Sequence, residues 1–379
     1  MRRGDGTGFA GLRSPFVWVV IVALVAGVVG LGVLLVATSG GTRSGNGEGP
    51  FPSYAQPGPF AAGVTTVALS YGPVEVWYPV EHAATAGHAR DSYDIRDWLP
   101  PDLASRVPKG LGSMGTDAYR DVAPSVHGPF PLVLFAHGLY SFRDQSTFLT
   151  SWLASWGFVV AAPEFTTHDL TEYFLLAGAT PPAGPSDYQV LFDTEQLLFH
   201  ESAGGSGRLH DLVRPGKIGV VGHSLGGLDA IQFASRPEVA VYVALAAGNA
   251  RPPADLPAKA SLYMTGAEDH DVEPAWVKGT YSAAPSPKKF VSLPKAGHLA
   301  FTDLCLIARG QGGVGAIGSA LRMNLPEGAP FIGRAVDGCA PGNLPAAAGF
   351  SIIRQVVTAE LESTLLNPPG SPENRVLTR

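Results

Sequence analysis

Short runs of apolar residues recur through the middle of the chain, and their spacing predicts alternating strands and helices. Runs of four to seven residues predict strands at 132–136, 158–162, 217–222, 239–245, 262–265 and 290–293. Apolar residues at helical spacing predict helices at 145–156, 187–202, 226–235 and 351–366. Strands that alternate with helices in this way form a mostly parallel sheet with helices on both faces. The pattern therefore predicts an α/β fold.

The chain before the first of these runs has a different pattern. Residues 64–70 and 74–78 alternate between apolar and polar positions, with Gly72 and Pro73 at the bend between them. This pattern predicts an antiparallel hairpin at an edge of the sheet. Residues 80–129 are polar and rich in turn-forming residues. We expect them to form an excursion on the surface rather than part of the core.

The N-terminal region contains a long run without a charged side chain, residues 16–37. As a helix this run would be roughly 33 Å long, close to the thickness of a bilayer core. Arginines before it would keep residues 1–15 in the cytoplasm. We expect a transmembrane signal-anchor in the cell membrane, with the rest of the chain outside. The alternative is a cleaved secretory signal that ends in the small residues at 36–39, which would give a secreted protein.

Composition divides the rest of the chain into three parts. Residues 38–60 are rich in Gly, Pro and Ser and predict a flexible linker. Residues 61–367 are long enough for one α/β domain with its own core. A polar tail follows at 368–379.

Charge and cysteine content limit the partners and the compartment. The net charge is −6, and no cluster of Lys and Arg follows the first residues, so we expect no nucleic-acid partner. The cysteines are Cys305 and Cys339. In an exported domain they are expected to form a disulfide, and two buried free thiols are the alternative.

A serine lies between two glycines directly after the predicted strand 217–222. The sequence Gly222-His223-Ser224-Leu225-Gly226 connects that strand to a predicted helix. This order is typical of a nucleophile elbow, a tight turn that exposes a reactive serine and leaves no room for neighbouring side chains. We therefore expect Ser224 to be a nucleophile, with Gly222 and Gly226 as the elbow glycines. The simpler alternative is a tight turn with a capping serine.

A nucleophilic serine needs a base and an acid, and both follow later strands. His298 comes in a loop of small residues after the strand 290–293 and is the predicted base. The loop after strand 262–265 holds three acids, of which Asp269 is the predicted partner of His298, with Asp271 and Glu268 as alternatives. The same loop also allows a cation site with His270, but no second group with metal-ligand spacing is visible, so we expect no metal.

Stabilising an oxyanion requires backbone N–H donors near the nucleophile. Leu225, directly after the serine, is expected to provide one donor. The loop after strand 132–136 reads His137-Gly138-Leu139-Tyr140 and is expected to provide the second from Leu139, with Tyr140 as the alternative. We expect His137 and His223 to serve in packing and hydrogen bonding rather than in proton transfer.

These motifs resemble the α/β-hydrolase superfamily, and within it the group of secreted platelet-activating-factor acetylhydrolases, with chlorophyllases and bacterial polyester hydrolases nearby. The resemblance covers roughly residues 64–300. It is carried by His137-Gly138-Leu139, by Ser141-Phe142-Arg143 and by Gly222-His223-Ser224-Leu225-Gly226-Gly227. It implies serine-esterase chemistry without a cofactor, with Ser224 as nucleophile, His298 as base, and Leu139 and Leu225 as oxyanion donors.

The chain departs from the acetylhydrolase pattern in two places. Those enzymes carry their acid after the strand that follows the nucleophile helix, where this chain has no carboxylate at 244–248. Asp269, one strand later, then resembles the acid of the polyester hydrolases and chlorophyllases. The second departure is the Gly-rich stretch 304–349, which holds both cysteines. We expect it to be a disulfide-linked flap beside the site, and a surface loop without function is the alternative.

The sequence thus predicts an extracytoplasmic serine hydrolase that cleaves carboxylic esters through an acyl-enzyme. The expected substrate is a small-molecule or lipid-like ester, including acetyl esters and polyesters, and the N-terminal helix is expected to contact the membrane. An acyltransferase that uses the same triad on a cell-envelope lipid or sugar is the alternative. A third hypothesis is a binding module that has kept the fold without catalysis.

Overall fold

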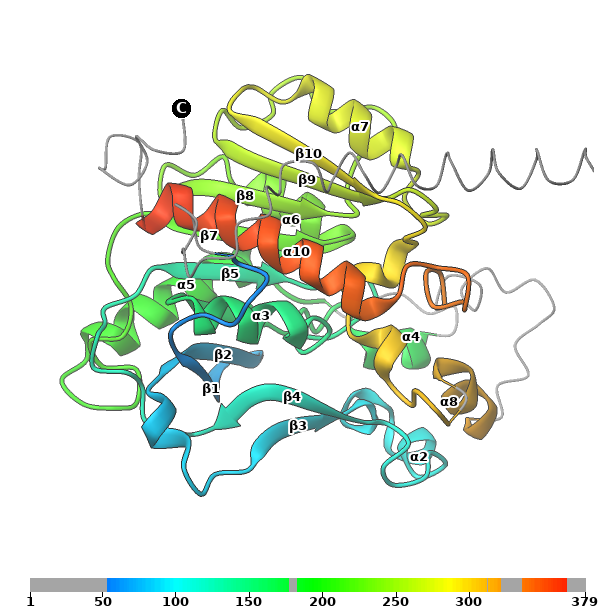
Figure 1. The fold of residues 1–379 in the computed structure, drawn as a ribbon, viewed down its shortest axis with the longest axis horizontal. Helices are drawn as coiled ribbons and strands as arrows, with labels where there is room; N and C mark the ends of the chain where they lie inside the picture. The colour runs from blue at the N-terminus through cyan, green and yellow to red at the C-terminus, as the bar shows by residue number, and fades with distance from the viewer. Residues whose placement is uncertain (1–52, 177–182, 312, 322–335, 367–379) are drawn as a thin grey trace, which may run out of the picture. The chain divides into compact units, whose positions relative to one another are not determined.

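The apolar runs form the strands of one mixed sheet in the computed structural model, which describes residues 53–176, 183–311, 313–321 and 336–366 (Figure 1). Within the described residues, ten strands are hydrogen-bonded in the order β10-β9-β8-β7-β5-β6-β2-β1-β4-β3. They are β1 (Ala61–Leu69), β2 (Gly72–Val80), β3 (Arg90–Asp94), β4 (Ser113–Arg120), β5 (Leu132–Ala136), β6 (Val159–Pro163), β7 (Ile218–His223), β8 (Val239–Leu245), β9 (Ala260–Gly266) and β10 (Lys288–Leu293). The predicted strands 132–136, 158–162, 217–222, 239–245, 262–265 and 290–293 are confirmed.

The sheet is parallel from its edge strand β10 to β6. Strands β6, β5, β7, β8, β9 and β10 pair in parallel with one another, whereas β2 pairs antiparallel with β6 and with β1. The carboxyl ends of the parallel strands therefore meet at one edge. In open α/β sheets this edge is where ligands bind.

Helices cover both faces of the sheet, as the alternating pattern predicts. The helices are α2 (Pro101–Ala104), α3 (Thr147–Ser155), α4 (Leu170–Leu176), α5 (Asp187–Ala203), α6 (Leu225–Phe233), α7 (Pro274–Ala283), α8 (Val314–Ala320) and α10 (Ala346–Leu361), which continues as a π-helical turn (Glu362–Leu366). Figure 1 shows α3 and α10 in front of the sheet. Of the four predicted helices, all are present, with ends that differ by a few residues.

Alternation along each central strand divides the core into two layers. In β5, Val133 and Phe135 pack in the layer with α3 and α10, whereas Leu132 and Leu134 pack in the layer with α5 and α6. All four side chains are fully buried. Burying a large apolar side chain stabilises the folded state by roughly 1.5–3 kcal/mol, so the two layers fix the sheet firmly between its helices.

The expectation that residues 80–129 lie on the surface is wrong in part. They contain β3 and β4, which extend the sheet beyond the β1–β2 hairpin, because β4 pairs in parallel with β1. The hairpin is therefore inside the sheet and not at its edge. The segment also has its own buried cluster, in which Tyr93 and Trp98 pack against Phe142. The few apolar residues of this segment are widely spaced, so the spacing of apolar residues in the sequence does not predict this cluster.

Residues 53–60, which the composition assigns to a flexible linker, make specific contacts with the domain. The Tyr54 hydroxyl donates to Glu362 Oε2 at 3.0 Å, and the Trp152 ring N–H donates to the Tyr54 carbonyl at 3.0 Å. The predicted transmembrane run at 16–37 and the tail at 368–379 lie outside the described residues. Among the residues that the structure does describe, none of the helices could cross a membrane.

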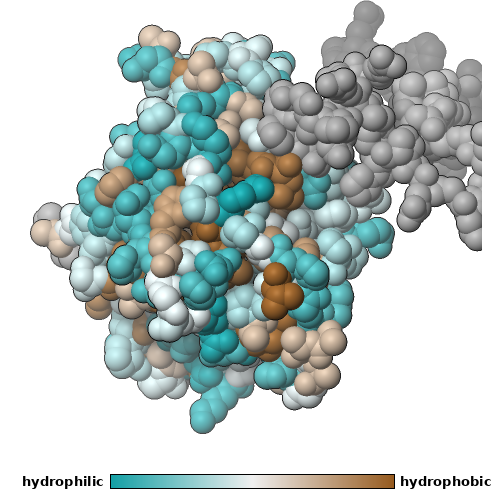
Figure 2. Space-filling view, turned by 90° about the vertical axis from the view of Figure 1, so that its left-hand side faces the viewer, coloured by the Kyte–Doolittle hydropathy of each residue, from teal (hydrophilic) through white to brown (hydrophobic). Residues whose placement is uncertain are grey.

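The face shown in Figure 2 is mostly hydrophilic, with hydrophobic residues in separate groups among polar ones. Hydrophobic side chains scattered singly over the surface in this way are normal in folded proteins.

Candidate active site

Ser224 lies on a sharp turn between β7 and α6. Its backbone has φ 56° and ψ −121°, a conformation that residues other than glycine rarely adopt. The turn lifts the side chain above the carboxyl end of β7, at the edge of the sheet where ligands bind. A strained serine at this point is the geometry of a nucleophile elbow, as the sequence predicts.

The elbow glycines are required by close backbone contacts. A Cβ on Gly222 would lie 1.9 Å from the carbonyl oxygen of Gly226, and a Cβ on Gly226 would lie 2.3 Å from the carbonyl oxygen of Ala136. Gly227 has a similar role, since its Cβ would lie 2.4 Å from the Cβ of Ala247. Three glycines therefore allow α6 to begin directly against β5 and β7.

Ser224, His298 and Asp269 form a continuous chain of hydrogen bonds. His298 Nε2 lies 2.9 Å from Ser224 Oγ, and His298 Nδ1 lies 2.9 Å from Asp269 Oδ2. A carboxylate only accepts hydrogen bonds, so Nδ1 carries the ring proton and Nε2 is free to accept the serine proton. Asp269 and His298 are buried, which keeps water from competing for these bonds.

The three candidate carboxylates in the loop after β9 have different hydrogen-bond partners. Asp269 Oδ1 accepts from the backbone N–H of Asp271 at 2.9 Å and of Val272 at 2.8 Å, which leaves Oδ2 for the histidine. Glu268 instead accepts from the side chain of Asn343 at 3.3 Å. The structure thus places Asp269 on His298 rather than Glu268 or Asp271. Within the described residues no group of three or more His, Cys, Asp or Glu side chains could hold a metal ion.

The backbone N–H groups of the loop after β5 differ in whether they have a hydrogen-bond partner. The N–H of Gly138 donates to Gln145 Oε1 at 3.1 Å, and that of Tyr140 donates to the His168 carbonyl at 2.8 Å. Among the described residues, the N–H groups of Leu139 and Leu225 have no hydrogen-bond partner. A Cβ on Gly138 would lie 3.2 Å from the Cβ of Ser224, so the loop and the elbow are in direct contact. Leu139 and Leu225 are therefore available as oxyanion donors.

Two further histidines lie beside the triad and have structural partners. His223 Nε2 lies 3.1 Å from the His298 carbonyl, and burial, together with the neighbouring His298 ring, holds the pKa of His223 well below its usual range. His223 is therefore neutral. His137 Nε2 accepts from the Phe165 N–H at 3.1 Å. Both positions agree with the packing and hydrogen-bonding roles expected from the sequence.

A cavity of about 300 Å³ opens beside Ser224 and His298. Seven of its 15 lining residues have apolar side chains, and these come from segments far apart in the sequence: Ile95, Leu139, Phe142, Leu170, Val272, Leu299 and Leu304. Ile95 belongs to the segment 80–129, which was expected on the surface, and Leu304 belongs to the predicted flap. Both segments thus contribute to the wall of the cavity.

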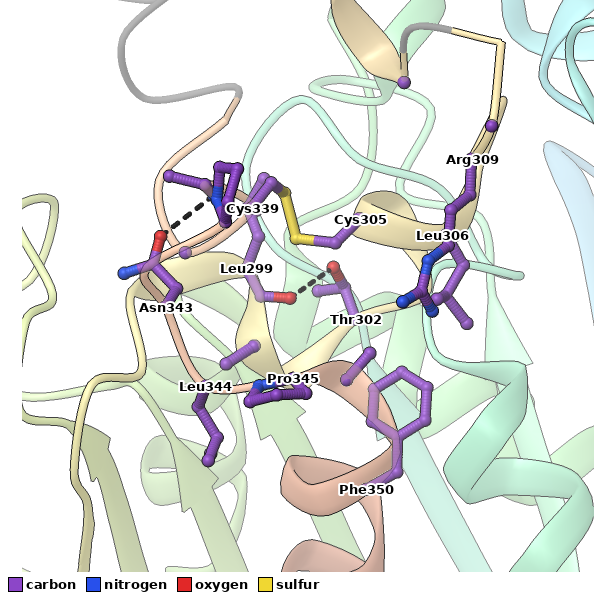
Figure 3. A pocket seen from close by; sticks show the side chains of 17 residues that line it. Leu299, Thr302, Cys305, Leu306, Arg309, Cys339, Asn343, Leu344, Pro345 and Phe350 are labelled. Atoms are coloured by element: carbon purple, nitrogen blue, oxygen red, sulfur yellow. Dashed lines mark hydrogen bonds between the residues drawn. A yellow bond between two sulfur atoms is a disulfide. The ribbon is translucent and has the colours of Figure 1, made fainter.

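The predicted disulfide between Cys305 and Cys339 is present. It lies over a second hollow, of about 440 Å³, shown in Figure 3 with Leu299 and Thr302 beneath the sulfur atoms. Leu299 lines both cavities. The disulfide is therefore close to the histidine loop, and Leu304, from the predicted flap, lines the cavity beside Ser224.

Two residues near the site were not found from the sequence. Gln145 accepts a hydrogen bond from the N–H of Gly138 and so fixes the turn there. It lies close to the Ser141-Phe142-Arg143 motif, and this proximity is a sequence signal that could have indicated its role. Asp337 accepts a hydrogen bond from the backbone N–H of His298 at 2.9 Å. Its position, 39 residues after the histidine in a Gly-rich stretch, gives no sequence signal.

Comparison with known proteins agrees with this arrangement. Residues 102–180 match the family model for platelet-activating factor acetylhydrolase, isoform II. Over these residues, which are less than half of the chain, the chain is similar to this acetylhydrolase family. The matched residues include His137-Gly138-Leu139 and end before Ser224.

A solved structure supports the same fold. The structure of a ferulic acid esterase from Streptomyces cinnamoneus aligns over 85% of this chain and 93% of its own, with a TM-score of 0.53 and 21% sequence identity. At this level of identity the likeness shows the fold alone. None of the curated proteins matches the chain.

Proposed function

We propose that this esterase-type hydrolase cleaves carboxylic esters through an acyl-enzyme, with Ser224 as nucleophile, His298 as general base and Asp269 as the acid that orients the base. The observation that carries the proposal is the pair of 2.9 Å contacts from Ser224 through His298 to Asp269, which begins at a serine with φ 56°. A turn that only connected a strand to a helix would not need this chain of bonds.

Each group has a defined role in the proposed reaction. Ser224 Oγ attacks the ester carbonyl while His298 Nε2 takes the hydroxyl proton, and the carbonyl oxygen becomes an oxyanion held by the N–H groups of Leu139 and Leu225. His298 then gives the proton to the leaving alcohol as the acyl–oxygen bond breaks. A water molecule repeats the sequence on the acyl-enzyme and releases the carboxylic acid. Asp269 stabilises the charged imidazolium at both steps.

The shape and lining of the cavity suggest the kind of ester. Its volume of about 300 Å³ is at the lower end of the range for ligand pockets, and its walls are mostly apolar. These features favour an ester with one short or medium apolar group beside the scissile bond. Leu139 is 48% exposed at its rim, which extends the apolar surface outward.

Hydrolysis of p-nitrophenyl esters of increasing acyl length by the purified protein tests the proposal. We expect hydrolysis by the wild type, loss of turnover in Ser224→Ala, and covalent labelling of Ser224 by a fluorophosphonate probe. The Ser224→Ala variant keeps the fold because the serine side chain is replaced by a smaller one. Wild-type-like hydrolysis by a folded Ser224→Ala protein would remove this serine from the mechanism.

We also propose that the enzyme acts outside the cytoplasm. Support comes from the charge-free run at 16–37 and from the Cys305–Cys339 disulfide, since disulfides persist in oxidising compartments. A reporter enzyme that is active only outside the cytoplasm, fused after residue 366, tests this directly. Activity of the fusion is expected, and activity only of a cytoplasmic reporter at the same point would contradict the proposal.

A further inference from the structure

Asp337 forms a bridge between the two loops that carry the base and the acid of the triad. Its Oδ2 accepts from the backbone N–H of His298 at 2.9 Å and of His270 at 3.0 Å, and its Oδ1 lies 3.0 Å from His270 Nδ1. His270 directly follows Asp269. One carboxylate thus bonds to the catalytic histidine itself and to the neighbour of the catalytic acid.

We propose that Asp337 is a positioning residue that sets the distance between the His298 and Asp269 side chains, an inference that rests on the proposed function. The two loops follow the neighbouring parallel strands β10 and β9, and both leave the sheet at its carboxyl edge. Beyond the sheet their backbones are joined by the N–H of Glu268, which donates to the Ala296 carbonyl at 2.9 Å. Asp337 adds a connection at the level of the catalytic side chains.

The segment that carries Asp337 is itself anchored to the histidine loop. The carbonyl of Asp337 accepts from the Leu299 N–H at 2.9 Å, and Gly338 packs so closely on Gly297 that a Cβ on Gly297 would lie 2.4 Å from the Gly338 nitrogen. These contacts fix the carboxylate from its own backbone. The Asp337 side chain is only 10% exposed, so its bonds compete little with water.

The disulfide supplies a covalent anchor for the same segment. Cys339 comes two residues after Asp337 and is bonded to Cys305, seven residues after His298. Figure 3 shows this bond between Cys339 and Cys305. Downstream, the N–H of Leu344 donates to the Lys295 carbonyl at 2.7 Å. The segment 336–339 is thus held on the C-terminal side of Asp337 by Cys339 and, further along, by Leu344.

The charge of Asp337 suits this role. Burial opposes ionisation of the carboxyl, but hydrogen bonds from the N–H groups of His270 and His298 and from the His270 ring outweigh it and lower the pKa of Asp337. The side chain is therefore a carboxylate, which accepts several hydrogen bonds at once.

Three variants separate the carboxylate's bonds from one another. Asp337→Ala removes all of them. Asp337→Asn keeps a carbonyl oxygen for the two backbone N–H groups and turns its amide toward His270 Nδ1. His270→Ala removes only the ring contact and keeps the backbone N–H. If positioning of the loops is the function, Asp337→Ala is the damaging change, and the other two variants stay near the wild type.

The expected result is a fall of about 10–100-fold in kcat for Asp337→Ala on a p-nitrophenyl ester, with little change in KM, because small misplacements of catalytic groups reduce turnover by about this much. Asp337→Asn should recover most of the loss. The low-field proton NMR signal of His298 Nδ1–H, which reports the bond to Asp269, should weaken or shift in Asp337→Ala only. A wild-type signal and kcat in folded Asp337→Ala would overturn the inference.

The NMR signal also separates this inference from the proposed function. If the wild type cleaves none of the esters but the signal still changes in Asp337→Ala and not in Asp337→Asn, the proposed function fails and the positioning role holds. If the wild type cleaves esters but the NMR signal is unchanged in Asp337→Ala, the proposed function holds and the positioning role fails.

The contribution of the disulfide is tested with the double variant Cys305→Ser/Cys339→Ser. We expect it to lower kcat in the same direction as Asp337→Ala, and we expect the two changes together to lower kcat by less than the product of their separate effects. Fully independent effects on kcat would mean that the disulfide does not act through Asp337.

Discussion

The backbone N–H of Tyr140 donates a 2.8 Å hydrogen bond to the carbonyl of His168, and this bond removes Tyr140 from the candidate oxyanion donors. On the other side of Leu139, the N–H of Gly138 donates to Gln145 Oε1 at 3.1 Å. Tyr140 has φ 55°, so the chain turns sharply just after Leu139. The turn and its two flanking bonds leave the N–H of Leu139 available in the loop that lies against Ser224. The sequence alternative of Tyr140 is therefore not favoured by the geometry.

Replacing the Leu139 amide by an ester tests this donor with the least disturbance. The α-hydroxy analogue of leucine, introduced by nonsense suppression, exchanges the N–H for an oxygen and keeps the side chain. We expect kcat to fall about 10²–10³-fold, as is typical when one oxyanion donor is lost. Steady-state kinetics with a p-nitrophenyl ester give the measurement.

The corresponding ester at Tyr140 is the matched control. It removes the hydrogen bond to His168 but no oxyanion donor, so kcat should change much less than in the Leu139 analogue. If the Tyr140 analogue lost more activity than the Leu139 analogue, the assignment of the two N–H groups would have to be reversed.

Substitution of the three acids in the loop after β9 tests the assignment of the triad acid. Asp269→Asn places an amide against His298 Nδ1, favours the wrong ring tautomer and is expected to lower kcat by about 10⁴-fold. Glu268→Gln should have little effect, because Glu268 contacts Asn343 and not the histidine. Asp271→Asn should also keep most activity, because its backbone N–H still bonds to Asp269. Measurement of kcat for the three purified variants at one pH shows which carboxylate is the triad acid.

A different ranking of the acid variants would have a specific meaning. Full activity of folded Asp269→Asn, with a large loss in Asp271→Asn, would show that the loop rearranges to bring Asp271 to His298. Thermal unfolding of each variant separates such a result from loss of the fold.

The elbow should tolerate no side chain at Gly226. In Gly226→Ala the Cβ would lie 2.3 Å from the backbone carbonyl of Ala136, which cannot move without shifting β5. We expect a loss of stability of about 1–3 kcal/mol or more and a large loss of activity. Gly318→Ala is the control, because nothing lies within 4 Å of a Cβ at that position in α8. Urea unfolding of both variants should show destabilisation only in Gly226→Ala.

The central strands and the triad were accessible from the sequence because each depends on a local pattern. The run 217–222 and the glycines around Ser224 contain the strand, the turn and the nucleophile in one short segment. His298 and Asp269 follow later strands of a parallel sheet, so the order of elements was enough to bring them to the same edge.

The parts that were missed depend on contacts between distant segments. Strands β3 and β4 have few consecutive apolar residues, and their place in the sheet follows from pairing of β4 with β1, about 50 residues earlier in the chain. Asp337 reaches His298 through a bend held by a disulfide. No periodic pattern records either contact, so neither could be derived from one sequence.

Asp303 should make the stability of the protein depend on pH. It is fully buried at the start of α3, where its carboxyl accepts from the Thr147 N–H at 2.6 Å and from the Phe148 N–H at 3.3 Å. Burial raises the pKa of Asp303 to about 7, although the hydrogen bonds from Thr147 and Phe148 act in the opposite direction. The folded protein therefore keeps a proton on this group that the unfolded chain, with an ordinary aspartate pKa, has already lost.

The sign of the effect follows from this difference in bound protons. Where the folded state binds more protons than the unfolded state, stability falls as pH rises, so the contribution of Asp303 is greatest at low pH and is lost as pH rises through about 7. Asp169 and Asp229, whose pKa values are raised to about 6 and about 7, titrate in the same range, so the comparison is made with Asp303→Asn. The asparagine at this position does not titrate. The other titratable groups are present in both proteins, so their contribution cancels when the two free energies of unfolding are subtracted.

Urea unfolding of the wild type and of Asp303→Asn at several values between about pH 5 and pH 8 measures the effect. The difference in free energy of unfolding, wild type minus variant, should decrease with rising pH by up to about 3 kcal/mol, since each unit of pKa difference corresponds to about 1.4 kcal/mol. Above about pH 8 the difference should level off, because Asp303 is then ionised in both states. A difference that stayed constant across this range would show that the buried carboxyl is already ionised at pH 5, and that the helix N–H groups stabilise its charge more than burial opposes it.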